Sequence, residues 1–279
     1  MLKYRKGLFL YFLIAITVIA AAGGYFYIEE VPSEYEKTLS QIEYQLGYSS
    51  VYAPCSIAAE EKAVQTDNVS SKMVYLTFDD GPSARTLEIL DILKEYNIKA
   101  TFFILSDEKE TSRDIVKRIY DEGHSIGVHS ASHAYEKIYK SVDHFLSDFE
   151  ICLEYIKDIT GEAPNIFRFP GGSVNSYNKD ICKELTDEMT RRGFTYFDWN
   201  VSAGDAASSY SMEDVLTNVL DGVSKYKTSV VLLHDGPNKS TTVEVLGSLI
   251  QTLQSQGAEI LPIDENTNVI QYIKADSVE

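Results

Sequence analysis

The chain opens with an uncharged hydrophobic run, residues 7–28, that is long enough to cross a membrane. A helix over these positions rises about 33 Å, against the ~30 Å thickness of the hydrocarbon layer. Three bases lie within residues 1–6, and the two residues that follow the run are acidic. Because basic flanks stay on the cytoplasmic side, we expect a single-pass anchor at the cell membrane, with residues 1–6 inside and the rest of the chain extracellular.

A cleaved signal peptide is the competing interpretation, since Ala20, Ala21 and Ala22 suit a signal peptidase. We favour the uncleaved anchor because the apolar run continues to Ile28, beyond the roughly 7 to 15 residues of a signal-peptide core. Residues 29–70 are rich in acids, serine and small residues. We expect this stretch to be a solvated stalk that holds the next domain away from the membrane.

From Lys72 onward, short runs rich in β-branched and aromatic residues alternate with longer segments whose apolar positions recur every three or four residues. The short runs predict strands and the longer segments predict helices. The seven predicted strands are 73–78, 101–105, 125–129, 166–169, 195–199, 229–234 and 259–262. The six predicted helices are 86–96, 112–122, 142–159, 179–192, 212–226 and 242–256.

This βα repeat predicts one α/β domain over residues 71–279. The continuous apolar run 230–233 is typical of a strand covered on both faces, as parallel sheets require. The pattern allows either an open, doubly wound sheet or a barrel. In both folds the functional groups gather at the carboxyl ends of the strands.

Composition narrows the function classes further. The 279 residues include 42 acids and 25 bases, a formal net charge of −17, which repels nucleic acids and anionic lipid headgroups. The three cysteines, Cys55, Cys152 and Cys182, are too few for a disulfide framework and do not follow zinc-knuckle spacing. Cys152 and Cys182 lie in predicted helices, where we expect small apolar core residues rather than a disulfide.

Ionisable residues fall at five of the predicted strand ends, and three of the five histidines of the chain are among them. A shared site at the carboxyl edge of the sheet explains this distribution better than scattered structural roles. The residues concerned are Asp79, Asp80, His129, His133, Arg168, Asp205, His234 and Asp235.

The spacing of His129 and His133 indicates a metal site. In a helical turn, imidazoles at positions i and i+4 share one face and can reach one ion. Such pairs on their own are more often surface or core residues, and only an added carboxylate reverses that preference. Two imidazoles and one Asp leave open positions for water and substrate, as catalytic zinc sites do, so the pattern predicts a hydrolase.

Asp79 and Asp80 need different roles, because neighbouring side chains of a strand point to opposite sides. One could bind the metal while the other faces the attacking water. The alternative is an ordinary turn, since Asp, Gly and Pro are all common in turns. Residues 79–82 taken alone favour that alternative.

Five motifs in chain order resemble those of the NodB-type polysaccharide deacetylases, carbohydrate esterase family four. They are TFDDG at 77–81, HSASH at 129–133, RFPGG at 168–172, the segment 199–205 and LLHD at 232–235. The match runs from about Lys72 to Ile263. The resemblance implies a distorted (β/α)7 barrel of the TIM type, and metal-dependent removal of N-acetyl groups from amino sugars.

The same resemblance implies roles around a divalent metal, for which Zn2+ is the first expectation and Co2+ an alternative. Asp80, His129 and His133 would be the metal ligands, and Asp79 would be the general base. Arg168 would hold Asp79 ionised and oriented through a charge-assisted hydrogen bond.

The remaining matched residues would complete the reaction. His234 would be the general acid that protonates the departing amine, with Asp205 orienting it. The backbone N–H of Gly171 would help to stabilise the tetrahedral oxyanion. Leu232 would line the pocket for the acetyl methyl group, and Trp199 would pack the barrel or border the substrate groove.

Two departures from the family pattern concern the substrate groove. The family often carries a bulky residue where Gly171 stands and a second Trp where Ala206 stands, so we expect a more open groove wall. His124 and His144 match no motif, and we interpret them as structural or surface residues.

An outward-facing anchored deacetylase lies beside the cell wall, which makes the N-acetylglucosamine of peptidoglycan the leading substrate. Another N-acetylated exopolysaccharide or a chitin-like polymer is the alternative, and the complete set of site residues disfavours a non-catalytic carbohydrate-binding protein. A dinuclear phosphoesterase would need more ligands and a basic phosphate clamp. The expected partners are the polysaccharide and the membrane, with no nucleic acid, and the protein is expected to be a monomer.

Overall fold

The computed structural model of the chain describes residues 72–206 and 210–274. The predicted cytoplasmic tail, membrane anchor and stalk, together residues 1–70, lie outside these ranges, and so does Cys55. Within the described ranges, no helix is both long and apolar enough to cross a bilayer.

The described residues form one parallel β-sheet whose strands are connected mainly by helices. Across the sheet the strand order is β5-β4-β3-β2-β1-β7-β6, while β8 pairs with the start of β1. The strands are β1 (Met73–Asp79), β2 (Thr101–Leu105), β3 (Ser125–Ser130), β4 (Ile166–Phe167), β5 (Thr195–Tyr196), β6 (Val201–Ser202), β7 (Thr228–His234) and β8 (Glu259–Ile260). The helices are α3 (Ala84–Glu95), α4 (Glu110–Asp121), α5 (Tyr135–Ile138), α6 (Val142–Thr160), α7 (Cys182–Arg191), α8 (Met212–Ser224) and α9 (Ser240–Ser255).

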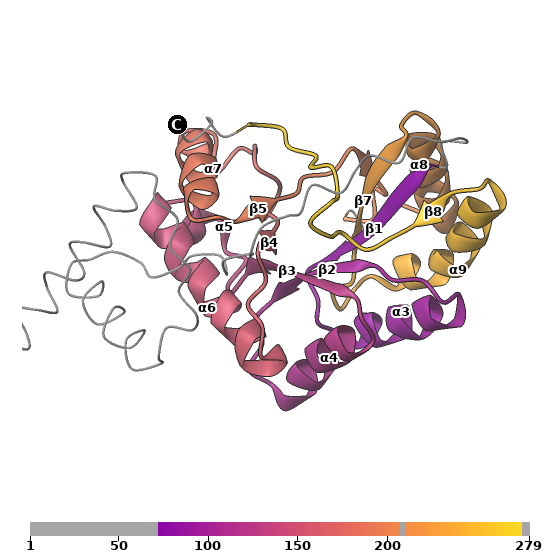
Figure 1. The fold of residues 1–279 in the computed structure, drawn as a ribbon, viewed down its shortest axis with the longest axis horizontal. Coiled ribbons are helices and arrows are strands. Elements are labelled where there is room, and N and C mark those ends of the chain that lie inside the picture. The colour runs from indigo at the N-terminus through magenta and orange to yellow at the C-terminus, as the bar shows by residue number, and fades with distance from the viewer. Residues whose placement is uncertain (1–71, 207–209, 275–279) are drawn as a thin grey trace, which may run out of the picture. The chain divides into compact units, whose positions relative to one another are not determined.

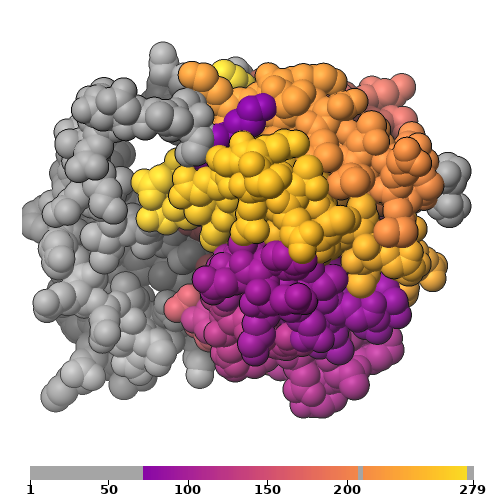
Figure 2. All heavy atoms as spheres, turned by 90° about the vertical axis from the view of Figure 1, so that its right-hand side faces the viewer, coloured from indigo at the N-terminus to yellow at the C-terminus, as the bar shows by residue number. Residues whose placement is uncertain are grey.

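The sheet curls into an incomplete barrel with its helices on the outside (Figure 1). Helices α8, α9, α3, α4 and α6 follow one another around the sheet, and each contacts the next. Figure 2 shows three of these neighbours, α8, α9 and α3, as successive bands across one face. In the described part of the chain no ladder joins β5 to β6. The α/β prediction is confirmed, and the curled sheet is consistent with the distorted (β/α)7 barrel that the motifs imply.

Strand β1 shows how the sequence pattern places a functional residue. Its side chains alternate between two faces. Val74, Leu76 and Phe78 are fully buried in the core that the sheet shares with the helices, whereas Tyr75 belongs to a separate apolar cluster. Asp79 ends the strand in phase with Tyr75. The period of two therefore directs the Asp79 carboxylate to the inner side of the curl.

The chain after β8 contributes Ile263 to the apolar cluster that contains Tyr75, which we call the inner cluster. The Ser125 hydroxyl donates a hydrogen bond to the Ile263 carbonyl oxygen at 2.6 Å, and the Ile263 N–H donates to the Thr101 hydroxyl oxygen at 2.8 Å. These bonds tie the C-terminal segment to β2 and β3. The buried members of the inner cluster are Tyr75, Phe103, Phe197, Val230 and Ile263.

Several short elements differ from the sequence predictions. The predicted strands 166–169 and 195–199 end at Phe167 and Tyr196, and neither β6 nor the one-turn helix α5 was predicted. Elements of two to four residues are too short to display a hydrophobic period. Cys152 is a buried free thiol, as expected of a small apolar core residue, whereas the free thiol of Cys182, at the start of α7, is only half-buried.

Candidate active site

The predicted strand-end residues meet at one edge of the sheet. Asp79 and His234 occupy paired positions at the ends of β1 and β7. His129 lies in the last part of β3, and Arg168 follows β4, where its N–H donates to the Val128 oxygen at 3.0 Å. Parallel strands bring their carboxyl ends to the same edge, so residues from four separate motifs become neighbours.

Asp80, His129 and His133 lie close enough together to share one metal ion. Their ligand atoms are all within 4.8 Å of one another. Asp80 Oδ1 lies 3.5 Å from His129 Nε2 and 3.3 Å from His133 Nε2. Across residues 72–206 and 210–274, this is the one such group of three or more His, Cys, Asp or Glu side chains.

The hydrogen bonds around the triad leave its ligand atoms available to a cation. His129 Nδ1 lies 2.9 Å from the Arg168 carbonyl oxygen. Since a carbonyl can only accept, Nδ1 carries the proton and Nε2 presents its lone pair. Asp80 Oδ1 is buried with no hydrogen-bond partner among the described residues. A buried, unpartnered carboxylate oxygen beside imidazole nitrogens fits a divalent metal.

The local electrostatics of Asp80 and His133 agree with this fit. Burial raises the pKa of Asp80, but the facing His129 and His133 imidazoles outweigh burial, and the net pKa is lowered. For His133, burial and the nearby His129 lower the pKa below its ordinary value. An ionised carboxylate and a neutral imidazole are the protonation states that bind metal. At His129, burial lowers the pKa, but the Asp79 and Asp80 carboxylates outweigh burial and raise it, so a metal would displace a proton there.

The segment between the two histidines is not the helical turn that their spacing predicts. His129 belongs to β3 and residues 131–134 form an irregular loop, so that prediction of local geometry was wrong. The rings nevertheless converge, with centroids 5.2 Å apart. His133 adopts a left-handed backbone conformation with φ of 51°, which bends the chain back toward His129.

Asp148 of α6 holds this loop, and the sequence analysis did not identify it. Its carboxylate accepts hydrogen bonds from the Ser130 hydroxyl and from the backbone N–H groups of Ala131, at 2.8 Å, and Ser132, at 2.9 Å. A turn that satisfies its backbone donors with a distant carboxylate leaves no local sequence signal. Only the packing of α6 against β3 brings the two together.

Asp79 is buried and held by a cation. Asp79 Oδ1 accepts a hydrogen bond from Arg168 Nη1 at 2.8 Å, and its Oδ2 lies 3.9 Å from His129 Nε2. Arg168 is itself completely buried, and its other nitrogens donate to the carbonyl oxygens of Phe197, at 2.8 Å, and Asp198, at 3.2 Å. The guanidinium therefore fixes the orientation of the Asp79 carboxylate.

His234 is paired with Asp205. His234 Nδ1 lies 2.9 Å from Asp205 Oδ1, and the His234 backbone N–H donates to Asp205 Oδ2 at 2.8 Å. Burial lowers the pKa of His234, but the hydrogen bond to Asp205 and the Asp79 and Asp80 charges outweigh it and leave the pKa raised. A raised pKa increases the protonated fraction near neutral pH, which suits a proton donor.

The three residues expected near substrate adjoin residues of this site, Gly171 and Leu232 in sequence and Trp199 in space, since the Trp199 ring centroid lies 5.8 Å from the Arg168 guanidinium carbon. Gly171 has a φ of 74°, in a loop after Arg168. Leu232 lies in β7 two positions before His234 and is 7% exposed. The Trp199 ring packs edge-on against Tyr272 with centroids 5.6 Å apart, and a Cβ added at Gly172 would lie 3.1 Å from the Trp199 ring.

Asp235 is a further buried carboxylate to which the sequence analysis assigned no role, although it directly follows His234. Its N–H donates to the Asp79 carbonyl oxygen at 2.9 Å, and the Thr86 hydroxyl donates to its Oδ2 at 2.5 Å. The carboxylate fills the space beside Gly81 that any side chain there would need. Burial raises the pKa of Asp235 to about 7. Asp235 thus ties β7 to the turn that carries Asp80.

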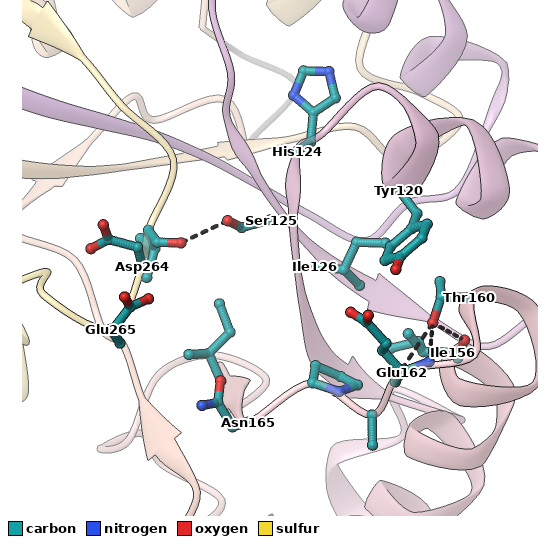
Figure 3. A pocket seen from close by; sticks show the side chains of 14 residues that line it. Tyr120, His124, Ser125, Ile126, Ile156, Thr160, Glu162, Asn165, Asp264 and Glu265 are labelled. Atoms are coloured by element: carbon teal, nitrogen blue, oxygen red, sulfur yellow. Dashed lines mark hydrogen bonds between the residues drawn. The ribbon is translucent and has the colours of Figure 1, made fainter. Parts of the chain in front are cut away.

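A cavity of about 390 Å³ lies at the amino ends of the strands, opposite the edge that carries the candidate site. Its walls include Ser125 at the start of β3 and Ile166 at the start of β4, and none of the predicted site residues lines it. Figure 3 shows the His124 ring turned away from the other side chains of this wall. His124 Nδ1 instead accepts a hydrogen bond from the Ala100 N–H at 3.1 Å, and His144 is exposed on α6. Both observations agree with structural or surface roles.

Comparison with known sequences supports the same chemistry. Residues 66–189 match the sequence model of the family described as polysaccharide deacetylase. A peptidoglycan-N-acetylglucosamine deacetylase of Bacillus cereus is 30% identical over 241 residues, which cover 85% of this chain and 83% of that protein.

Solved structures share the fold. The catalytic domain of a peptidoglycan N-acetylglucosamine deacetylase from Eubacterium rectale matches with a TM-score of 0.69 at 39% identity, over 76% of this chain and 98% of that one. A family 4 acetyl xylan esterase from Clostridium thermocellum, solved with a cobalt ion, matches with a TM-score of 0.58 at 29% identity, over 68% and 88% of the two chains.

Proposed function

The chain belongs to the polysaccharide deacetylase family, and from that premise we propose that it hydrolyses the N-acetyl groups of peptidoglycan N-acetylglucosamine with a bound divalent metal. Family membership makes the protein a deacetylase, a hydrolase that releases acetate. The choice of substrate is supported by the relatives from Bacillus cereus and Eubacterium rectale, both named for it. The observation that carries the metal-dependent mechanism is the triad with its unpartnered Asp80 oxygen.

Asp80, His129 and His133 would hold the metal. Two imidazoles and one carboxylate leave positions open for water and substrate, and zinc is the first expectation for this donor set. Cobalt is the ion bound in the related acetyl xylan esterase. When bound, such an ion acts as a Lewis acid that polarises the acetyl carbonyl and lowers the pKa of a water molecule.

Asp79 would be the general base. Its carboxylate lies beside the triad but is oriented by Arg168. Asp79 would accept a proton from water as the water oxygen bonds to the acetyl carbon. The Gly171 N–H would donate to the oxygen that becomes negatively charged, and Leu232 would contact the acetyl methyl group.

His234 would be the general acid. It would transfer its proton to the sugar nitrogen as the carbon–nitrogen bond breaks, which leaves acetate and a free amine as products. Asp205 would stabilise the protonated imidazole through its bond to Nδ1. Trp199 would border the groove that receives the sugar.

We further propose that residues 7–28 anchor the enzyme and that residues 29–70 hold the domain 71–279 outside the cell, as a monomer beside the wall. The charge pattern of the N-terminal segment supports this arrangement. The full-length protein should sediment with membranes and resist carbonate extraction. A soluble product that begins near Gly23 would show that the segment is a cleaved signal peptide.

Acetate release tests the activity and identifies the substrate. Purified peptidoglycan, chitooligosaccharides, poly-N-acetylglucosamine and acetylated xylan are compared at equal acetyl concentration. We expect the fastest release from peptidoglycan. Faster release from another polymer would reassign the substrate, and no release from any of them would refute the proposed activity.

Metal removal tests the mechanism. Chelation should abolish acetate release, and Zn2+ or Co2+ should restore it. His133→Ala should bind less metal by elemental analysis, whereas the matched control His144→Ala, at an exposed position of α6, should bind as much as the wild type. Full turnover by the metal-free protein would exclude this mechanism.

A further inference from the structure

Two tyrosines extend outward from the proposed metal ligands. The Tyr135 ring lies edge-on to the His133 ring, with centroids 5.0 Å apart and an interplanar angle of 78°. The Tyr177 ring lies against Tyr135, with centroids 5.1 Å apart and an angle of 33°. Tyr177 is 53% exposed. One aromatic ring therefore separates the metal centre from a second ring that faces solvent.

The Tyr135 ring occupies space that is free because residue 171 is a glycine, where the family often carries a bulky residue. A Cβ added at Gly171 would lie 2.8 Å from Tyr135 Cε1 and 3.1 Å from its hydroxyl oxygen. The ring thus fills the volume that a side chain at position 171 would take. The space beside Gly171 is therefore occupied by an aromatic residue of α5.

The backbone beneath Tyr177 is fixed by a local hydrogen-bond network. Asn175 Oδ1 accepts from the N–H groups of Tyr177, at 2.8 Å, and Asn178, at 3.1 Å. Asn175 Nδ2 donates to the Pro170 oxygen at 3.1 Å, and the buried Asn178 side chain donates to the Gly172 oxygen at 3.2 Å. The exposed ring is therefore presented on an ordered loop, so binding to it costs little conformational entropy.

We propose that Tyr135 and Tyr177 form a subsite for the sugar ring next to the one being deacetylated, with the apolar C–H face of that sugar stacked on Tyr177. The inference rests on the proposed function, since it names where the polymer continues from the metal centre. A pyranose has an apolar C–H face, which matches the face of the tyrosine ring. The neutral N-acetylated sugar needs no charged partner at this position.

The test compares Tyr177→Ala and Tyr177→Phe in the metal-loaded full chain. With chitotetraose, Tyr177→Ala should raise KM roughly fivefold to tenfold at unchanged kcat, while Tyr177→Phe keeps the wild-type KM because the ring is retained. With 4-nitrophenyl acetate, which contains no sugar to occupy the subsite, all variants should hydrolyse the ester at the wild-type rate. Tyr226→Ala is the matched control, since Tyr226 is 43% exposed but precedes β7, at the end of the strand opposite His234. Elemental analysis should show equal metal in every variant.

Calorimetric binding of chitotetraose separates this inference from the proposed function. Wild type that binds the tetramer without releasing acetate would refute the activity on this polymer, and a weaker Kd in Tyr177→Ala would still support the subsite. If Tyr177→Ala had the same KM and Kd as the wild type, the proposed subsite would be refuted, while the proposed activity would stand. Equal losses in Tyr177→Ala and Tyr226→Ala, or a loss of bound metal, would also overturn it. If wild type neither binds nor hydrolyses the tetramer, both proposals fail for this sugar.

Discussion

Adjacent residues of identical chemistry occupy two different environments at the end of β1. Asp79 completes the strand and is held by Arg168, whereas Asp80 has a φ of 75° and its Oδ1 lies near His129 and His133. The left-handed backbone at Asp80 is what separates the two carboxylates. A pattern of letters cannot show this conformation, because Asp in the same sequence context also adopts ordinary turn geometry.

This difference predicts distinct phenotypes for the two Asn substitutions. Asp79→Asn should keep its metal and lose a factor of ~10² to 10⁴ in turnover, as expected when a general base is removed. Asp80→Asn should lose metal. Elemental analysis, acetate release and circular dichroism of both variants test the assignment. Exchanged phenotypes would reverse the two roles, and full activity in both would mean that the segment is only a turn.

A second residue-level prediction concerns His124 and acid stability. Burial lowers the pKa of His124 to about 4 from an ordinary value of 6.5. The unfolded chain therefore binds a proton at this residue below pH 6.5, and the folded chain does so only near pH 4. The free energy of unfolding should fall over that interval by up to about 3 kcal/mol from this residue alone.

Urea denaturation at several pH values measures this effect. His124→Asn keeps an acceptor for the Ala100 N–H but cannot titrate, so its stability should fall less steeply between pH 6.5 and 4. His144→Asn, at an exposed position, should keep the wild-type slope. Equal slopes in His124→Asn and the wild type would show that His124 does not carry this dependence.

At the scale of elements, α6 controls the loop that presents His133. Asp148→Ala removes the acceptor of two loop N–H groups and should weaken metal binding by about 10 to 100-fold, with the fold intact. Asp158→Ala is the matched control, because Asp158 lies on the same helix and pairs with Arg113 away from the loop. Metal titration of both variants measures the effect. Unchanged metal affinity in Asp148→Ala would refute the proposal that Asp148 positions the His133 loop for metal binding.

The same scale shows how far the sequence predicts the structure. The central strands β1, β2, β3 and β7 follow from their runs of apolar and β-branched residues, and the long helices follow from their hydrophobic periods. The motifs identify the residues that meet at the strand ends. The pairs of residues that form β4, β5 and β6 carry no period of their own. Their strand conformation depends on neighbours distant in sequence, as does the contact between Asp148 and its loop. Tyr135 was missed because its relation to Gly171 exists only after folding.

For the whole molecule, we predict that a fragment of residues 69–279 folds without the preceding segments. The Lys72 ammonium group donates to the carbonyl oxygens of Val223, at 3.0 Å, and Ser224, at 2.8 Å, and Met73 then begins the sheet. The fragment should match the full chain in thermal midpoint and in acetate release from chitotetraose. A control fragment that starts at Thr77 loses half of β1 and should aggregate. Aggregation of both fragments would move the domain boundary toward the N-terminus.

The position of β1 in the sheet has a consequence for how the protein is made. β1 is the first of the described strands, whereas β7 and β8, which pair with it, are the last. A chain synthesised N-terminus first therefore carries β1 with an unsatisfied edge until nearly all of the following residues have emerged. His234, which occupies the position paired with Asp79, is also synthesised late because it ends β7. We therefore expect no partial activity from a translation product that stops before β7, since the proposed base and acid come together only near the end of synthesis.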